Sequence, residues 1–234
     1  MSAHSTPWRD ETQPHDPPRS QAQIDGLLHR LGPEPKDVLD LGCGDGRVLV
    51  PLARAGHRLT GIDRRHDLLE RCRARLSEID RAAELIEADF LEAWPPLAGG
   101  FDAVCCLGNT LMTVADVDQA VELLARAARA LNNGGAFITD DCPQEFWPEL
   151  TGGNWQSGLS PDGTMQMVWE PDDAVFALRR GAEIDLDCER PRSTDTRLRL
   201  WSAGALRLAG RVAGLSTPRH LPEAGLLVMG RADR

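Results

Sequence analysis

Three glycines follow a short apolar segment near the amino end of the chain. Residues 38–41 read Val-Leu-Asp-Leu, and positions 42, 44 and 46 are glycine. Because glycine has no Cβ, the backbone of such a turn can approach a ligand closely, and doubly wound sheets bind ligands at the carboxyl ends of their strands. The third glycine comes one residue too early for the Gly-x-Gly-x-x-Gly dinucleotide fingerprint, which disfavours an NAD-type oxidoreductase.

Acidic residues end the next two predicted strands. Asp63 stands 19 residues beyond Gly44, where its carboxylate can accept hydrogen bonds from both hydroxyls of a ribose. Asp89 and Phe90 end the third predicted strand, and they offer a carboxylate for an exocyclic amine and a ring to lie beside a base. Taken with the glycine turn, these strand ends predict a nucleoside-binding edge of a sheet.

The elements that must position these residues alternate along the chain. Strands are predicted at 38–41, 58–62, 84–88, 102–107 and 136–139. A first helix is expected from Ser20 as its N-cap to Gly32, another follows the glycine turn, and two more span 67–76 and 116–131. Strands that alternate with helices at this spacing predict a doubly wound α/β fold with a mostly parallel sheet.

The pattern changes after residue 141. Residues 142–200 lose helical periodicity and contain strand-like segments at 165–170, 175–178, 184–186 and 196–201. The earlier rhythm then resumes with a helix from Ser202 to about residue 213 and a last strand at 225–230. We expect a flexible arm at 1–19 and a single domain at 20–234, in which 142–200 is an antiparallel insertion that covers the substrate. Four tryptophans either line its pocket or form its core: Trp147, Trp155, Trp169 and Trp201.

From about residue 19 to 140, the chain resembles the class I S-adenosylmethionine-dependent methyltransferases, with a weaker similarity at 197–231. Residues 40–46, Asp-Leu-Gly-Cys-Gly-Asp-Gly, are similar to the first motif of that family, and 61–63 and 88–90 to its second and third. The resemblance implies a seven-stranded Rossmann-like sheet with S-adenosyl-L-methionine as the cofactor. It also implies these cofactor-binding residues: Asp40, Gly42, Cys43, Gly44, Asp63, Asp89 and Phe90.

A closer resemblance lies at 105–110, Cys-Cys-Leu-Gly-Asn-Thr, which is similar to a segment of glycine N-methyltransferase and related small-molecule methyltransferases. It implies that the Leu107 backbone contacts the cofactor and that Asn109 helps to place the substrate. Arg19 stands about where that family has an arginine on the cofactor carboxylate, and a surface position is its alternative. After strand five the family has an arginine that receives the glycine carboxylate. This chain has Asp140 and Asp141 instead, which disfavours glycine as the substrate.

The same acids suggest how an acceptor is held. Either Asp140 or Asp141 orients a cationic or polar substrate together with Asn109, or these acids cap the following turn. Candidates for a general base are Asp140, Asp141, Glu145 and His220, although an amine that binds neutral needs none, because positioning supplies much of the catalysis. We expect a methyltransferase acting on a small amine or another non-anionic polar acceptor. The alternatives are a catalytically inactive cofactor-binding protein and an NAD-type oxidoreductase.

Composition narrows the partners further. The chain has 36 acidic and 26 basic residues and a net charge of −10, which disfavours nucleic acid as a partner. It has no tyrosine and one lysine, Lys36, so tyrosine chemistry is excluded and a Schiff base disfavoured. His57 and His66 are expected at the surface. The six cysteines lack metal-ligand spacing, and no signal-peptide pattern or membrane-length apolar run occurs, so we expect a cytoplasmic protein without a metal.

Overall fold

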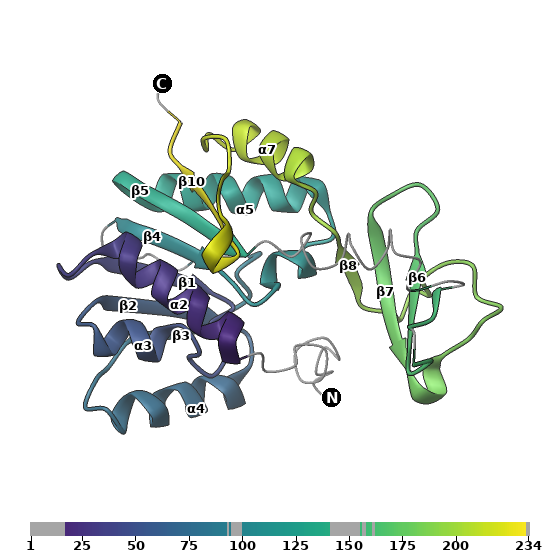
Figure 1. The fold of residues 1–234 in the computed structure, drawn as a ribbon, viewed down its shortest axis with the longest axis horizontal. Helices are drawn as coiled ribbons and strands as arrows, with labels where there is room; N and C mark the ends of the chain where they lie inside the picture. The colour runs from purple at the N-terminus through teal and green to yellow at the C-terminus, as the bar shows by residue number, and fades with distance from the viewer. Residues whose placement is uncertain are drawn as a thin grey trace.

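The computed structural model describes residues 17–92, 94, 100–140, 155, 158–160 and 162–232, and it contains two sheets (Figure 1). The larger sheet has the strand order β3-β2-β1-β4-β5-β10-β9. Its strands, in chain order, are β1 (Asp37–Leu41), β2 (Arg58–Asp63), β3 (Glu84–Glu87), β4 (Phe101–Cys106), β5 (Leu131–Asp140), β9 (Arg219–Leu221) and β10 (Leu226–Gly230). The first five strands pair in parallel, and β10 runs antiparallel to both β5 and β9. The predicted doubly wound, mostly parallel seven-stranded sheet is confirmed.

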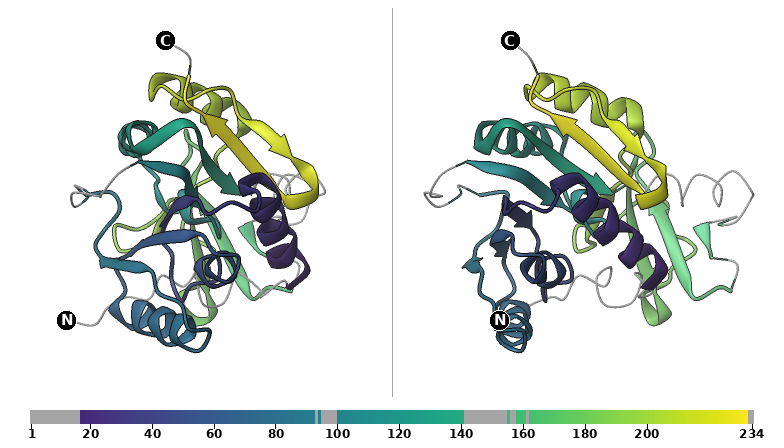
Figure 2. Two further views of the ribbon diagram at one scale, coloured as in Figure 1. Left: turned by 90° about the vertical axis from the view of Figure 1, so that its left-hand side faces the viewer. Right: turned by 60° about the vertical axis from the view of Figure 1, so that its left-hand side comes forward.

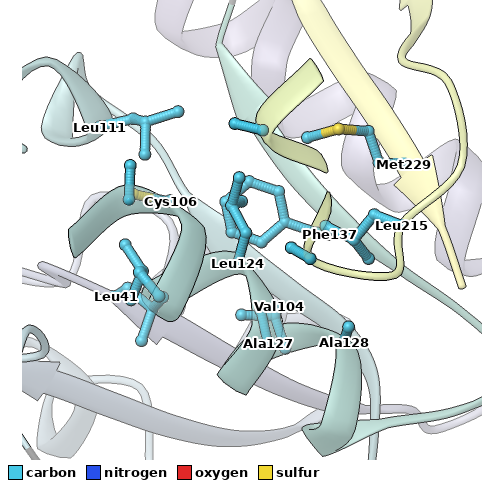
Figure 3. Close-up of a cluster of buried hydrophobic side chains, with 14 of the residues drawn as sticks. Leu41, Val104, Cys106, Leu111, Leu124, Ala127, Ala128, Phe137, Leu215 and Met229 are labelled. Atoms are coloured by element: carbon cyan, nitrogen blue, oxygen red, sulfur yellow. The ribbon is translucent and has the colours of Figure 1, made fainter. Parts of the chain in front are cut away.

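Helices cover both faces of this sheet (Figure 2). One face carries α2 (Pro17–Leu31), α3 (Leu49–Arg54) and α4 (His66–Ser77), and the other carries α5 (Val117–Ala130) and α7 (Ala203–Val212). Successive strand residues point to opposite faces, so each face of the sheet has its own core cluster. Val38 belongs to the first cluster, under α2, α3 and α4, whereas Leu39 belongs to the second, under α5 and α7. Figure 3 shows the second cluster, in which Phe137 of β5 packs between the sheet and the helices.

Side-chain caps explain where α5 and α7 begin, whereas α3 and α4 begin without one. Asp116 accepts a hydrogen bond from the Gln119 N–H at 2.8 Å, and Ser202 accepts one from the Ala205 N–H at 3.2 Å, so both act as N-caps. The expected start of the first helix at Ser20 is wrong, because α2 begins at Pro17. Proline is tolerated in a first turn, where backbone N–H groups have no partner inside the helix. Ser20 therefore lies inside α2, where its hydroxyl accepts a hydrogen bond from Arg47 at 3.3 Å.

The smaller sheet confirms the predicted antiparallel insertion after the fifth strand. It consists of β6 (Met165–Trp169), β7 (Val175–Arg180) and β8 (Arg197–Arg199). The strand expected at 184–186 is absent, since a short helical turn, η3 (Gly181–Glu183), precedes this segment. The backbone of Asp185 pairs instead with the side chain of Gln166, at 2.6 and 2.9 Å. The apolar side of the small sheet packs on Met112, which lies in η1 (Thr110–Thr113) of the main fold.

In the part of the chain that the structure describes, no helix is long and apolar enough to span a membrane. The same residues contain no cluster of His, Cys, Asp and Glu able to hold a metal ion. Cys43, Cys72, Cys105 and Cys106 are buried, and burial raises the pKa of the Cys72 thiol to about 11. These buried cysteines therefore act as small apolar core residues.

Candidate active site

The ends of the first three strands surround one cavity of about 150 Å³. Gly42 follows β1, Asp63 ends β2, and Asp89 and Phe90 follow β3, and all four line this cavity. Carboxylates of Asp63 and Asp89 can accept hydrogen bonds from ribose hydroxyls and an exocyclic amine, and the Phe90 ring provides an apolar wall. The structure thus brings together four residues that were predicted to bind one ligand.

The glycine turn after β1 takes its shape from the end of β2. The Ile62 carbonyl oxygen accepts hydrogen bonds from the Gly42 and Cys43 N–H groups, at 2.8 and 3.1 Å. Asp63, which is only 2% exposed, accepts the Gly44 N–H with Oδ2 and the Arg65 N–H with Oδ1, both at 2.9 Å. Gly42 and Gly44 have φ values of +72° and +56°, a region that suits glycine. Asp63 therefore holds the turn in place as well as lining the cavity.

Gly61, in the neighbouring strand β2, explains how the glycine turn packs. A Cβ on Gly61 would lie 2.7 Å from Cys43 Sγ and 2.8 Å from Leu49 Cδ1, so the absence of a side chain at this position of β2 makes room for both. Cys43 and Asp40 are buried, and the Cys43 side chain points into the core. The Cys43 thiol therefore belongs to the core, and Cys43 is not among the residues that line the cavity.

The turn after β3 is fixed from α5. Asp89 Oδ1 accepts the Leu91 N–H at 2.9 Å, while Arg126 donates to the carbonyl oxygens of Phe90 and Leu91, at 3.3 and 2.6 Å. The Arg126 guanidinium also lies 5.8 Å from the Trp94 ring centroid. Burial lowers the pKa of Arg126, which nevertheless stays charged at neutral pH. These contacts hold Phe90 at the cavity wall.

Asp140, at the end of β5, joins three elements. Its carboxylate accepts hydrogen bonds from the Gly108 N–H at 2.8 Å and the Asn109 N–H at 3.1 Å, and so caps the turn after β4. From α2, Gln23 Nε2 donates to it at 3.4 Å and Arg19 Nη2 lies 3.8 Å away. Asp140 therefore caps the turn after β4, whereas the turn that it was predicted to cap follows it and lies outside the described residues.

Asn109 lies at this capped turn with φ +56° and is 6% exposed. Its Oδ1 is buried and has no hydrogen-bond partner among the described residues. Asn109 lines a small cavity of about 20 Å³ together with Thr139, Asp140 and Trp201. Leu107 is buried, and its carbonyl oxygen accepts the Thr110 hydroxyl at 2.7 Å. An acceptor atom that is buried without a donor costs free energy.

The remaining predictions about the site concern residues that are not described or that lie elsewhere than expected. Asp141, Glu145 and Trp147 lie outside the described residues. His220 was expected in a loop but lies in β9, where it pairs with Leu227 of β10. His57 was expected at the surface but is 6% exposed, because it lies under the amino edge of the sheet with Nδ1 accepting the Lys36 N–H at 3.2 Å.

Sequence reasoning missed six residues that line the larger cavity, of which Ala88 and Leu91 flank the predicted Asp89 and Phe90. Arg64 and Arg65 directly follow Asp63, Thr113 ends η1, and Thr196 precedes β8 in the insertion. The arginines follow a recognised strand end and could have been included on that ground. Neither threonine belongs to a motif, and Thr196 reaches the cavity only because of the tertiary fold.

The fold and this edge define a Rossmann-like protein with a nucleoside-type site. Comparison with known proteins is consistent with that class. The family model described as "Methyltransferase domain" matches residues 38–135. The chain is 33% identical over 188 residues to the cypemycin N-terminal methyltransferase of a Streptomyces species, covering 77% of this chain and 72% of that protein. It is 27% identical over 173 residues to the ubiquinone biosynthesis O-methyltransferase of Xanthomonas axonopodis, covering 70% and 69%.

A structural comparison agrees. The S-adenosylmethionine-bound amino pentose methyltransferase of Micromonospora echinaspora superimposes with a TM-score of 0.61 at 20% identity, covering 96% of this chain and 92% of that one. The chain belongs to the class I S-adenosylmethionine-dependent methyltransferases. Its cofactor is S-adenosyl-L-methionine. The alternative prediction of an NAD-type oxidoreductase is therefore wrong.

The residues present suit this cofactor. The cavity has two carboxylates and one aromatic ring, which match the hydroxyls, the amine and the flat base of an adenosine, while the unpaired Asn109 Oδ1 lies beyond β4. When bound, the cofactor supplies an activated methyl group on a sulfonium centre. The protein's part is to bind, to orient and to exclude water.

Proposed function

We propose that this methyltransferase transfers the methyl group to the amine of a small, non-anionic molecule. The observation that carries the proposal is the buried, unpaired Oδ1 of Asn109. A carbonyl oxygen is only an acceptor, so its missing partner must be a donor such as the N–H of an amine.

The charge around Asn109 supports the same acceptor class. The neighbouring carboxylate of Asp140 would repel an anionic substrate, whereas a neutral or cationic amine is tolerated there. Asp140 already accepts two backbone N–H groups, so its role in the proposal is to position Asn109 rather than to remove a proton. The in-line reaction then needs no base when the amine binds in its neutral form.

The similar proteins favour nitrogen over oxygen without excluding either. The cypemycin enzyme is named as an N-terminal methyltransferase and the Micromonospora protein as an amino pentose methyltransferase, whereas the Xanthomonas relative is an O-methyltransferase. The Asn109 acceptor fits a hydroxyl donor as well, so a hydroxyl substrate is the outcome that the experiment must separate.

We further propose that the residues predicted to hold the cofactor do so in this chain. Asp63, Asp89 and Phe90 would hold the adenosine part, and the glycine turn would approach the remainder through its backbone. Arg19 would serve the carboxylate end, from its position 3.8 Å from Asp140. The complete proposed set is Arg19, Asp40, Gly42, Cys43, Gly44, Asp63, Asp89, Phe90 and Leu107.

The test is a methyl-transfer assay that measures S-adenosylhomocysteine formation with matched primary amines, alcohols and thiols of similar shape. We expect turnover with amines, and an increase of roughly tenfold or more in KM for Asn109→Ala, since removal of one partner of a buried hydrogen bond costs about 1–3 kcal/mol. Asn133→Ala, an exposed asparagine in β5, is the matched control and should leave KM unchanged. Turnover with alcohols alone would refute the amine assignment, and no turnover with any member would favour a catalytically inactive cofactor-binding protein.

A further inference from the structure

The insertion contributes to the wall of the cofactor cavity. Thr196, directly before β8, lines the same cavity as Asp63 and Phe90, and its side chain is exposed. Thr113, at the end of η1, lines that cavity as well. The insertion was expected to cover the substrate, whereas this residue faces the adenosine side of the site.

Both neighbours of Thr196 are anchored to the small sheet. Asp195 accepts hydrogen bonds from Arg179 Nη2 at 2.6 Å and from the Arg192 N–H at 2.7 Å, and Arg179 on β7 is 1% exposed. On the other side, Arg197 Nε lies 3.2 Å from Glu170 Oε1. Thr196 is therefore held between two ion pairs that link it to the rest of the small sheet.

The small sheet is in turn attached to the segment that carries Thr113. Figure 1 shows β8 as the edge strand of the small sheet that lies nearest to the main fold. Arg199 of β8 donates to the Ala115 carbonyl oxygen at 2.6 Å and pairs with Asp173, and Trp201 Nε1 donates to the Leu111 carbonyl oxygen at 3.1 Å. The two threonines thus reach the cavity from segments that are bonded to each other.

We propose that Thr196 and Thr113 are cofactor-binding residues, and that the small sheet thereby closes the adenosine site and retains the cofactor. The cavity of about 150 Å³ is smaller than the roughly 300–1,000 Å³ of pockets for drug-sized ligands, so it takes only part of the cofactor. That part is the adenosine, since Asp63, Asp89 and Phe90 line the same cavity. The Thr113 hydroxyl donates to the Thr110 carbonyl oxygen at 2.7 Å and keeps its lone pairs for a ligand donor. The Thr196 hydroxyl offers both a donor and an acceptor.

Calorimetric titration of the whole chain with S-adenosylhomocysteine tests this proposal without any methyl acceptor, so its outcome is independent of the substrate class proposed above. Thr196→Val keeps the shape and removes the hydroxyl, and it should raise Kd by about 2- to 10-fold, the usual worth of one hydrogen bond. Thr196→Trp should fill part of the cavity and raise Kd by a larger factor. In a displacement experiment, this variant should also release S-adenosylhomocysteine faster than the wild type does.

Thr194→Trp is the matched control, because Thr194 is an exposed threonine of the same loop that does not line the cavity. Far-ultraviolet circular dichroism and thermal unfolding check that each variant keeps the fold. Wild-type affinity in Thr196→Trp would overturn the proposal. Equal weakening by Thr196→Trp and Thr194→Trp would also overturn it, because the effect would then belong to the loop and not to the contact.

Discussion

Both carboxylate oxygens of Asp140 lie within hydrogen-bond distance of the Asn109 N–H, at 3.2 and 3.1 Å. Asn109 has a left-handed backbone conformation that costs free energy for a residue with a side chain, and this carboxylate holds it there. The end of β5 therefore sets the orientation of a side chain that follows β4.

Asp140→Asn should lower both stability and turnover. Its amide nitrogen cannot accept an N–H, and hydrogen bonds to charged groups contribute about 1.5–3 kcal/mol, so we expect a loss of about 2 kcal/mol in the free energy of unfolding. We also expect a fall in kcat/KM of roughly tenfold or more, with a smaller change in S-adenosylhomocysteine affinity. Denaturant unfolding and steady-state kinetics measure these quantities. Asp172→Asn, at an exposed aspartate, should change neither, and unchanged kinetics in Asp140→Asn would contradict the positioning role.

Asp63→Asn should weaken cofactor binding. One of its two side-chain atoms would become a donor facing the N–H of Gly44 or Arg65, so the glycine turn must distort. The loss of one charge-assisted hydrogen bond predicts a rise in Kd for S-adenosylhomocysteine of about 10-fold or more, measured by calorimetry. Asp118→Asn changes an exposed aspartate in the first turn of α5 that does not line the cavity, and it should bind like the wild type. Equal affinities in the two variants would show that Asp63 does not shape the site.

Gly61→Ala should destabilise the fold through overpacking. The added Cβ would come within 2.7 Å of Cys43 Sγ, and overpacking of a core usually costs about 1–3 kcal/mol. Adding Cys43→Ala should recover part of that loss, with a coupling free energy of about 0.5 kcal/mol or more. Gly204→Ala, in the first turn of α7 and without a close contact, is expected to be neutral or stabilising. Additive effects of Gly61→Ala and Cys43→Ala would refute the contact.

His57 should make the fold sensitive to mild acid. Burial, and secondarily the charge of Lys36, lower its pKa below the ordinary value of 6.5. Below about pH 6.5 the unfolded chain binds a proton that the folded chain resists, so the free energy of unfolding falls as pH falls, until His57 is protonated in the folded state too. His57→Gln should flatten this dependence in denaturant unfolding between pH 7.5 and pH 5 (roughly the range in which histidine titrates). His29→Gln, at an exposed position of α2, should keep it, and an unchanged slope in His57→Gln would refute the assignment.

The sequence was informative where local pattern and sheet geometry coincide. Alternating strands and helices predicted a mostly parallel sheet, and because parallel strands end at one edge, the sequence alone was enough to place Asp63 and Asp89 near the glycine turn. The partners of Asp140 could not be predicted in this way, since Gln23 and Gly108 are far from it in sequence and meet it only in the folded chain. The burial of His57 was missed because its side chain bonds to the backbone of Lys36, 21 residues away, a contact that leaves no periodic signal.

At 184–186, by contrast, the local pattern predicted a strand that the structure does not contain. Ile184 and Leu186 alternate with Asp185 as in an exposed strand, yet Gln166 binds both backbone groups of Asp185 and so takes the place of a neighbouring strand. Thr196 could not be predicted for another reason. It belongs to no motif, and it reaches the cavity only because the small sheet packs against η1 of the main fold.

The Ile62 carbonyl oxygen, which accepts both the Gly42 and the Cys43 N–H, links the ligand-binding turn to the pairing of β1 with β2. The turn is therefore complete only when these two strands are joined, so ligand occupancy protects that pairing against local opening. A ligand at 100 times its Kd adds about 2.7 kcal/mol to the folded state, and native-state hydrogen exchange should show the slowing first at these two amides. The amino-terminal half of the sheet would then open as one cooperative unit, and it would open less often as the cofactor concentration rises.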